Sequence, residues 1–177
     1  MKIMRASDKS RNGMRDLAKF FPANSNMIEI GCYSGESTRI WLSTNKIKNI
    51  YCVDPWGRVI NKNDHYKPTV MIEVESKFDE LLTDSRITKL SGFSNEHLPQ
   101  FLNANTHINV IYIDGDHSYN GVKYDIELAL QIVEDNGIIC GHDINHAQAG
   151  KAIIDAFGFV DVQFADGSWL KFKSRIV

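Results

Sequence analysis

Two short segments rich in aspartate and histidine carry the side chains best suited to chemistry. Residues 112–119 read YIDGDHSY and residues 140–143 read CGHD, and each segment ends an apolar run typical of a buried strand. In a parallel sheet the carboxyl ends of the strands face one crevice, so we expect four ionisable side chains to converge there. Such a group is costly to bury unless its members pair or bind a ligand. The four residues are Asp114, His117, His142 and Asp143.

The residue types in this cluster indicate a metal ion and a proton acceptor. Two carboxylates on adjacent strand ends suit a hard divalent cation such as Mg²⁺, which keeps positions open for water or substrate oxygens. A substrate hydroxyl bound to such an ion loses its proton more easily. The imidazole of His117, with an unperturbed pKa of about 6.5, is a suitable general base. We therefore predict Asp114 and His117 as catalytic residues, while purely structural roles for His117 and His142 stay open.

A glycine-containing turn follows the first predicted strand, where residues 29–37 read EIGCYSGES. Gly31 and Gly35 permit positive φ angles and a close approach of the backbone to a ligand. The helix that follows presents free N–H groups to an anion. Asp54 ends the next strand, where a carboxylate can hold the ribose hydroxyls of an adenosine. The alternative is a tight turn without a ligand, and the missing G-x-G-x-x-G pattern disfavours a dinucleotide.

The elements that must position these residues alternate between apolar runs and helical spacing. Short apolar runs rich in β-branched residues predict strands at residues 27–31, 49–54, 87–91, 108–114 and 137–143. Helical spacing predicts helices around residues 9–20, 35–44, 71–81, 98–102, 122–133 and 148–157. Alternating runs at residues 160–165 and 169–173 flank an aspartate-glycine pair, which indicates a hairpin. The prediction is an α/β fold: a Rossmann-like, doubly wound, mainly parallel seven-stranded sheet that ends in an antiparallel hairpin.

The polar stretch at residues 56–69 is the one long irregular segment of this predicted fold. Long loops in compact domains often act as functional lids. Trp56 and Tyr66 are candidates to stack on an adenine or to close over a substrate, and His65 is a candidate to reach the crevice. The alternative for Trp56 is packing at the edge of the sheet.

The length and charge of the chain limit its class and its partners. A chain of 177 residues is expected to form one domain, here residues 1–177. The formal net charge of −2 gives no sign of a nucleic-acid surface. Three cysteines without paired spacing argue against disulfides and favour a reducing, cytoplasmic compartment. No apolar stretch is long enough for a membrane span, so neither a membrane nor a nucleic acid is expected as a partner.

The turn at residues 29–37 resembles motif I of the class I S-adenosylmethionine-dependent methyltransferases, and within them the catechol O-methyltransferase branch. The resemblance implies that S-adenosylmethionine is the cofactor and that the whole turn, with Gly31 and Gly35, contacts it. Glu29 would lie near the methionine part, and Tyr33 and Ser37 would contact its amino and carboxylate end. Two further matches are Asp54, the acidic ribose ligand, and Gly92-Phe93-Ser94, the loop that borders the adenine.

The acidic segments resemble a subgroup of small methyltransferases that also includes sugar and macrolide-sugar O-methyltransferases. In metal-dependent relatives, the aspartate that matches Asp114 and an acidic pair after strand five hold Mg²⁺, and the histidine that matches His117 is the base. Here Asp143 is kept, but His142 stands where those relatives carry a second acid. We therefore predict Asp114, Asp143 and His142 as metal ligands, and an imidazole ligand would favour Mn²⁺, Fe²⁺ or Zn²⁺ over Mg²⁺.

These observations predict O-methylation of a small hydroxylated acceptor, with sugars among the candidates. Few residues precede the first strand, so we expect the acceptor pocket to be shallow or completed by another subunit of a homo-oligomer. Three alternatives remain. The chain could be a non-catalytic S-adenosylmethionine-binding module or a subunit of a larger assembly, a nucleic-acid or protein methyltransferase, or a nicotinamide oxidoreductase.

Overall fold

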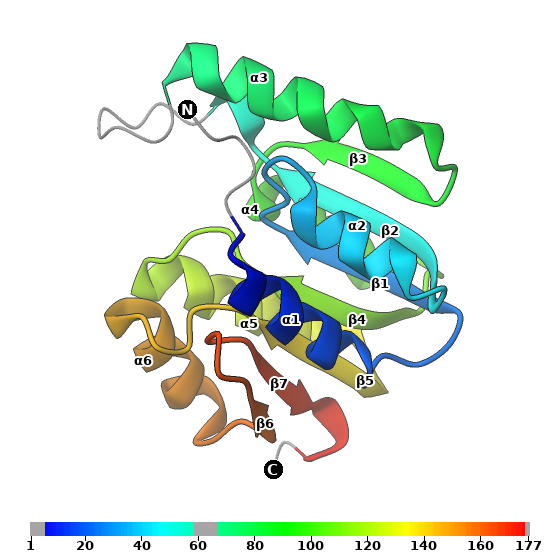
Figure 1. Ribbon diagram of the computed structural model, residues 1–177. Coiled ribbons are helices and arrows are strands. Elements are labelled where there is room, and N and C mark those ends of the chain that lie inside the picture. The colour runs from blue at the N-terminus through cyan, green and yellow to red at the C-terminus, as the bar shows by residue number, and fades with distance from the viewer. Residues whose placement is uncertain (1–5, 59–66, 176–177) are drawn as a thin grey trace.

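The computed structural model describes residues 6–58 and 67–175, and its central feature is a seven-stranded sheet (Figure 1). The strand order is β3-β2-β1-β4-β5-β7-β6. The first five strands pair in parallel, whereas β7 runs antiparallel to both β5 and β6. This topology confirms the predicted Rossmann-like sheet with its terminal hairpin. The strands are β1 (Ser25–Ile30), β2 (Ile47–Asp54), β3 (Ile87–Ser91), β4 (Ile108–Ile113), β5 (Val133–Gly141), β6 (Val162–Gln163) and β7 (Trp169–Phe172).

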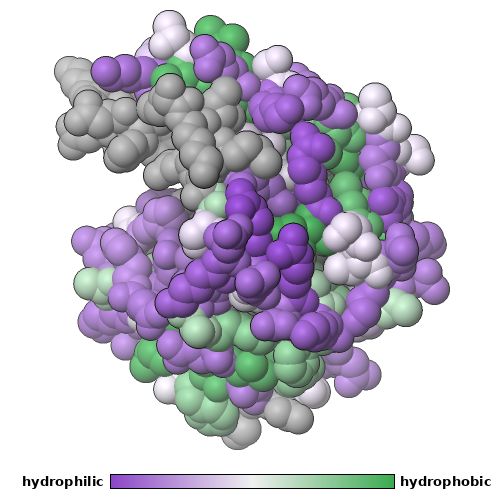
Figure 2. Space-filling model, in the orientation of Figure 1, coloured by the Kyte–Doolittle hydropathy of each residue, from purple (hydrophilic) through white to green (hydrophobic). Residues whose placement is uncertain are grey.

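Helices cover both faces of the sheet. Side chains of α1, α2 and α3 share one apolar cluster with one face of the strands, and those of α5 and α6 share a second cluster with the other face. Figure 1 shows α1 and α2 in front of the sheet, and Figure 2 shows that this side of the molecule is mainly hydrophilic. The helices are α1 (Asp8–Ala18), α2 (Glu36–Ser43), α3 (Pro68–Asp79), α4 (Ser94–His97), α5 (Tyr119–Ile132) and α6 (Ala147–Phe157), with 3₁₀ turns at Trp56–Arg58, Glu80–Thr83, Leu98–Asn103 and Lys173–Arg175.

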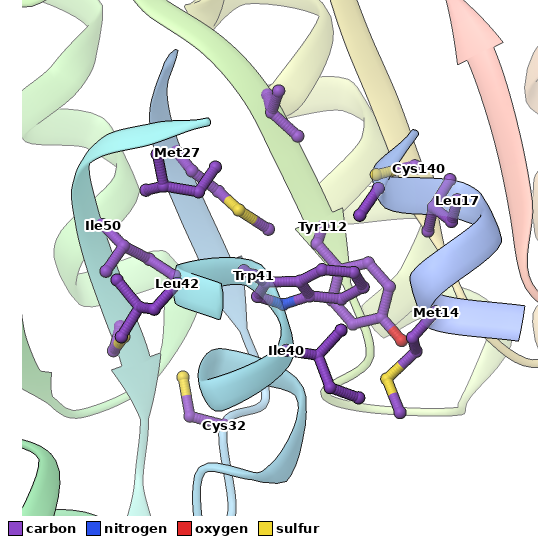
Figure 3. Packing of buried hydrophobic residues seen from close by; sticks show 14 of the residues in the cluster. Met14, Leu17, Met27, Cys32, Ile40, Trp41, Leu42, Ile50, Tyr112 and Cys140 are labelled. Atoms are coloured by element: carbon purple, nitrogen blue, oxygen red, sulfur yellow. The ribbon is translucent and has the colours of Figure 1, made fainter. Parts of the chain in front are cut away.

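The continuous apolar runs of the sequence form strands because both of their faces are buried. Met27 and Ile28 are neighbours on β1, yet they belong to different clusters, since successive side chains of a strand point to opposite faces. In the first cluster Trp41 of α2 is fully buried, and its ring centroid lies 5.0 Å from that of Tyr112 on β4 (Figure 3). The two clusters fix the positions of the strand ends on which the cleft is built.

Three predicted elements differ from the structure in their limits or in their type. Val133 was assigned to a helix by its apolar spacing, but it begins β5, where its β-branched side chain lies in the second cluster. The short helix expected at residues 98–102 is a 3₁₀ turn, Leu98–Asn103, with a proline in its first turn. The first hairpin strand is reduced to Val162–Gln163. Apolar spacing thus located these elements but did not give their limits.

The segment that follows β2 is only partly described. Trp56 is fully buried, its indole N–H donates to the Tyr33 carbonyl oxygen at 2.9 Å, and its ring packs 4.8 Å from that of Phe78. The packing alternative is therefore confirmed for Trp56. His65 and Tyr66 lie outside the described residues. Within the described parts of the chain, none of the helices is long and apolar enough to cross a membrane.

Gly31 stands where the ends of β1 and β4 meet. Its φ of +86° lies in the left-handed region, and its N–H donates to the Val53 carbonyl at 2.9 Å. The Asp114 N–H donates to the Ile30 carbonyl at 2.9 Å, and a Cβ added at Gly31 would lie 2.1 Å from the Asp114 carbonyl oxygen. Only glycine fits this position, because any side chain would push the two strand ends apart.

We expect Gly31→Ala to destabilise the fold by about 1–3 kcal/mol, because the added methyl group meets rigid backbone at an unfavourable φ. Urea unfolding followed by circular dichroism measures this change. Gly57→Ala is the matched control, since a Cβ at Gly57 meets no atom within 4 Å. Equal stability of the two variants would contradict the proposed backbone constraint.

Candidate active site

A cleft of about 1370 Å³ opens at the carboxyl ends of the parallel strands. Its walls come from the loops after β1 to β5 and from the first turns of α5, as expected for a fold of this topology. The cleft is large enough for a small molecule, since pockets for such ligands measure roughly 300–1,000 Å³. Of the predicted site residues, the cleft is lined by Gly31, Tyr33, Ser37, Asp54, Phe93, Ser94, Asp114, His117, His142 and Asp143, whereas Glu29 and Gly35 lie behind its wall.

The turn after β1 adopts an uncommon backbone path. Gly31, Tyr33 and Gly35 all have positive φ angles, and Gly35 is the residue that caps the start of α2. A Cβ at Gly35 would lie 2.4 Å from Leu81, so this glycine allows the turn to pack against the chain beneath it. The turn therefore presents backbone and the N-terminal end of α2 to the cleft, which is an arrangement suited to a carboxylate or other anion.

Glu29 ties the start of α2 to β1 from inside the protein. Its carboxylate is fully buried and accepts hydrogen bonds from the Ser37 hydroxyl, the Thr38 hydroxyl at 2.6 Å and the Trp41 indole at 3.0 Å. Burial raises the pKa of Glu29 to about 7, although these hydrogen bonds lower it. Ser37 lines the cleft, so Glu29 acts on the cleft through the Ser37 hydroxyl and not by direct contact.

Asp54 shapes the same turn from β2. Its Oδ2 accepts the N–H groups of Cys32 at 3.0 Å and Tyr33 at 2.9 Å, and its Oδ1 accepts the N–H of Trp56 at 2.7 Å. Burial raises its pKa, and the backbone hydrogen bonds oppose that rise. A carboxylate offers about four acceptor positions. Three are occupied by the protein itself, which the sequence could not reveal, and capacity for one further donor remains.

The acidic segments after β4 and β5 meet as predicted. The Nε2 atom of His117 lies 2.9 Å from Oδ2 of Asp143 and 3.5 Å from Oδ1 of Asp114. Hydrogen bonds to the two carboxylates raise the pKa of His117 to about 10, and the hydrogen bond to His117 is the main reason that the pKa of Asp143 is lowered. One ligand atom from each of the three residues lies within 4.8 Å of the others, a set that is able to hold a divalent cation.

His142 lies beside this set and faces two carboxylates. Its Nδ1 lies 3.0 Å from Oδ1 of Asp143, and its Nε2 lies 3.7 Å from Oδ2 of Asp166 in the β6–β7 hairpin. Burial lowers the pKa of His142, but the hydrogen bond to Asp143 and the nearby carboxylates leave it raised. The geometry therefore groups His117, and not His142, with the two candidate metal ligands.

Asp166 and Asp125 are acidic residues near the cleft that the sequence reasoning missed. Asp166 lies in the hairpin turn, where its carboxylate accepts from the Ser168 backbone and hydroxyl, and nothing in the sequence connects it to His142. Asp125 lies on α5, is buried and lines the cleft. A signal for Asp125 was present, because this carboxylate stands between Val122 and Ile126 on the apolar face of a predicted helix.

The chain matches known methyltransferases. A family profile described as "Methyltransferase domain" matches residues 28–144, which is more than half of the chain. An uncharacterised protein of Acanthamoeba polyphaga mimivirus is 22% identical over 152 residues, which cover 85% of this chain and 65% of that protein. The chain thus spans less than two thirds of the length of this relative.

Solved structures share the fold. The O-methyltransferase of Bacillus cereus, determined in complex with S-adenosylhomocysteine, has a TM-score of 0.63 and 16% identity, with 94% of this chain and 80% of that chain covered. The TDP-rhamnose 3'-O-methyltransferase CalS11 of calicheamicin biosynthesis has a TM-score of 0.62 and 17% identity, with 93% and 78% covered. These solved structures show a shared fold, and the profile match over more than half of the chain shows that the chain belongs to the methyltransferase-domain family.

Proposed function

We propose that this protein methylates a hydroxyl group of a small acceptor, with a divalent cation assisting and sugars among the candidate acceptors. The observation that carries the proposal is the cluster of Asp114, His117 and Asp143, which opens on the same cleft as the glycine turn. The similarity in fold to O-methyltransferases, one of them described as acting on TDP-rhamnose, supports it.

The cofactor supplies a methyl group on a sulfonium sulfur, which leaves as a neutral thioether when the methyl group is transferred. We propose that the turn from Gly31 to Gly35 and the N-terminal end of α2 hold the methionine end, with Tyr33 and Ser37 in contact. Glu29 fixes the Ser37 hydroxyl in place. The remaining acceptor capacity of Asp54 is assigned to a ribose hydroxyl. Phe93, which is 43% exposed, and Ser94 are assigned to the border of the adenine.

The donor set fits a divalent cation, because two carboxylate oxygens are hard ligands and the cluster opens on the cleft. Asp114 and Asp143 would hold the ion, which would lower the pKa of a bound acceptor hydroxyl. His117 then receives the hydroxyl proton. With both carboxylates uncompensated, its pKa of about 10 keeps the imidazole protonated. When the charge of these two carboxylates is neutralised, the pKa of His117 falls. A proton acceptor that works near neutral pH needs such a lowered pKa.

We further propose that residues 1–177 act as one methyltransferase domain, because helices of this chain cover both faces of the sheet. A homo-oligomer stays a prediction. Phe20 at the end of α1 is 42% exposed, and its ring contacts Phe164 and Phe172 of the hairpin region.

We expect Asp54→Ala to lower both the stability of the fold and the affinity for S-adenosylhomocysteine. Removing the carboxylate leaves three N–H groups without an acceptor, at a combined cost of at least about 2 kcal/mol. Urea unfolding and isothermal titration measure the two effects. Asp54→Asn, which keeps one acceptor oxygen, is expected to lose less of both. Wild-type stability in Asp54→Ala would show that these hydrogen bonds do not hold the turn.

We expect His117→Gln to lower methyl transfer by about 10²–10⁴-fold, the usual contribution of a general base, while the affinity for S-adenosylhomocysteine stays within threefold of wild type. A tritiated methyl-transfer assay over a panel of glycosides and catechols measures the rate. His107→Gln is the control, since His107 is an exposed histidine that is paired with Glu134 and precedes β4, at the opposite end of that strand from the cleft. Cofactor binding without transfer to any hydroxylated acceptor would favour the non-catalytic module.

We expect Asp143→Asn to weaken Mn²⁺ binding by at least about tenfold, because it removes one of two carboxylate ligands. Titration of Mn²⁺ followed by electron paramagnetic resonance measures this affinity directly. His117→Gln should retain Mn²⁺ affinity if His117 is the base, and a loss in that variant would make it a ligand instead. Full methyl transfer in excess EDTA would remove the metal from the mechanism.

A further inference from the structure

The turn of the β6–β7 hairpin contacts the loop that follows β5 and carries Asp143. The Ile144 N–H donates to the Gly167 carbonyl oxygen at 3.1 Å. On the other side of Asp143, the indole N–H of Trp169 donates to the His142 carbonyl oxygen at 3.0 Å. Both chain neighbours of Asp143 are therefore held by the hairpin, whose strand β7 lies beside β5 (Figure 1).

Asp143 itself has a backbone conformation that needs such support. Its φ of +61° lies in the left-handed region, which costs energy in residues other than glycine. Its carbonyl oxygen accepts the His146 N–H at 2.9 Å, which closes a turn just before α6. A strained residue of this kind persists where its surroundings fix it. The direction of the Asp143 carboxylate thus depends on contacts that its neighbours make.

A buried carboxylate of the hairpin turn also faces this loop. The Asp166 side chain is 1% exposed, and its two oxygens accept the Ser168 N–H at 3.1 Å and the Ser168 hydroxyl at 2.8 Å. Helix α1 closes another side, since a Cβ added at Gly13 would lie 2.0 Å from Cγ of Asp166. The carboxylate is therefore held in place by the turn and by α1, and its Oδ2 lies 3.7 Å from Nε2 of His142.

The imidazole of His142 connects this carboxylate with Asp143. Its Nε2 atom is buried and lacks a hydrogen-bond partner among the described residues, so its interaction with Asp166 is an electrostatic attraction and not a hydrogen bond. Its Nδ1 atom lies 3.0 Å from Oδ1 of Asp143. The other oxygen of Asp143, Oδ2, lies 2.9 Å from Nε2 of His117. The two oxygens of Asp143 are thus divided, one toward His142 and one toward the cluster.

We infer that Asp166 is a positioning residue, which holds the His142 ring so that Asp143 directs Oδ2 into the cluster. Groups that orient a metal ligand from behind are usually needed for full metal affinity. The inference rests on the proposed role of Asp143 as a ligand. Asp166 is not among the residues that line the cleft, so it acts through His142 and Asp143 and not by contact with a substrate.

The first test removes the charge of Asp166 but keeps its size. Asp166→Asn retains an oxygen for the Ser168 N–H and places an amide N–H group where a carboxylate oxygen faced His142. In crystals of the metal-free variant, the Nδ1–Oδ1 contact between His142 and Asp143 is expected to lengthen beyond about 3.5 Å. Mn²⁺ affinity, measured by electron paramagnetic resonance, is expected to fall at least about threefold.

Two further variants separate positioning from a merely structural role. Asp161→Asn is the matched control and should keep wild-type Mn²⁺ affinity, because Asp161 lies beside the same hairpin but is paired with Lys171. In a protein that already carries His142→Gln, Asp166→Asn should cause no further loss of affinity, since its effect passes through His142. A structural role would instead lower stability in urea unfolding and weaken Mn²⁺ binding equally in both backgrounds, which would overturn the inference.

The remaining outcomes separate the inference from the proposed metal site. A wild-type contact between His142 and Asp143, or wild-type Mn²⁺ affinity, in Asp166→Asn overturns the inference and leaves the metal site standing. Failure of wild type to bind Mn²⁺ overturns the metal site, and the metal-free crystals still decide whether Asp166 positions Asp143. If Asp166→Asn does not fold, Gly13→Ala replaces it, because the added Cβ displaces the Asp166 carboxylate without changing any charge. The same two losses are expected, and their absence overturns the inference.

Discussion

The contact between the backbone of Gly31 and that of Asp114 is the constraint on which the site depends. It brings the end of β1 against the end of β4, so the turn that follows one strand and the acidic segment that follows the other share a cleft. The two sheet faces are packed independently, but both clusters include residues of β1 and β4. The approach of the two backbones thus sets where the cleft lies, whichever side chains line it.

The sequence predicted the mainly parallel sheet with its terminal hairpin and the convergence of Asp114, His117 and Asp143, because both follow from periodicity and from the rule for parallel strand ends. It did not predict the surroundings of His142, whose Nδ1 contacts Asp143 and whose Nε2 lies 3.7 Å from Asp166 of the hairpin. It also did not predict that three backbone N–H groups occupy most of the acceptor positions of Asp54, because a residue pattern does not show where backbone N–H groups point.

Three buried carboxylates in and behind the cleft wall differ in the hydrogen-bond donors that surround them. Glu29 is bonded to side chains of α2, and Asp54 is bonded to backbone N–H groups. In Asp125, the Oδ1 atom has no hydrogen-bond partner among the described residues. Burial raises the pKa of all three carboxyl groups, and their hydrogen bonds oppose that rise. The first two carboxylates organise the turn after β1, whereas Asp125 lies apart from that turn on α5.

The hold of Asp54 on the turn has a consequence for the end of the catalytic cycle. Asp54 already orders this loop through its hydrogen bonds to Cys32 and Tyr33. The entropy lost when the loop becomes ordered is therefore a cost of folding and not of ligand binding. A preorganised loop offers the same contacts to the methyl donor and to the demethylated thioether, which differ only at sulfur. The spent cofactor should therefore compete strongly with fresh donor, and sustained turnover would depend on its removal.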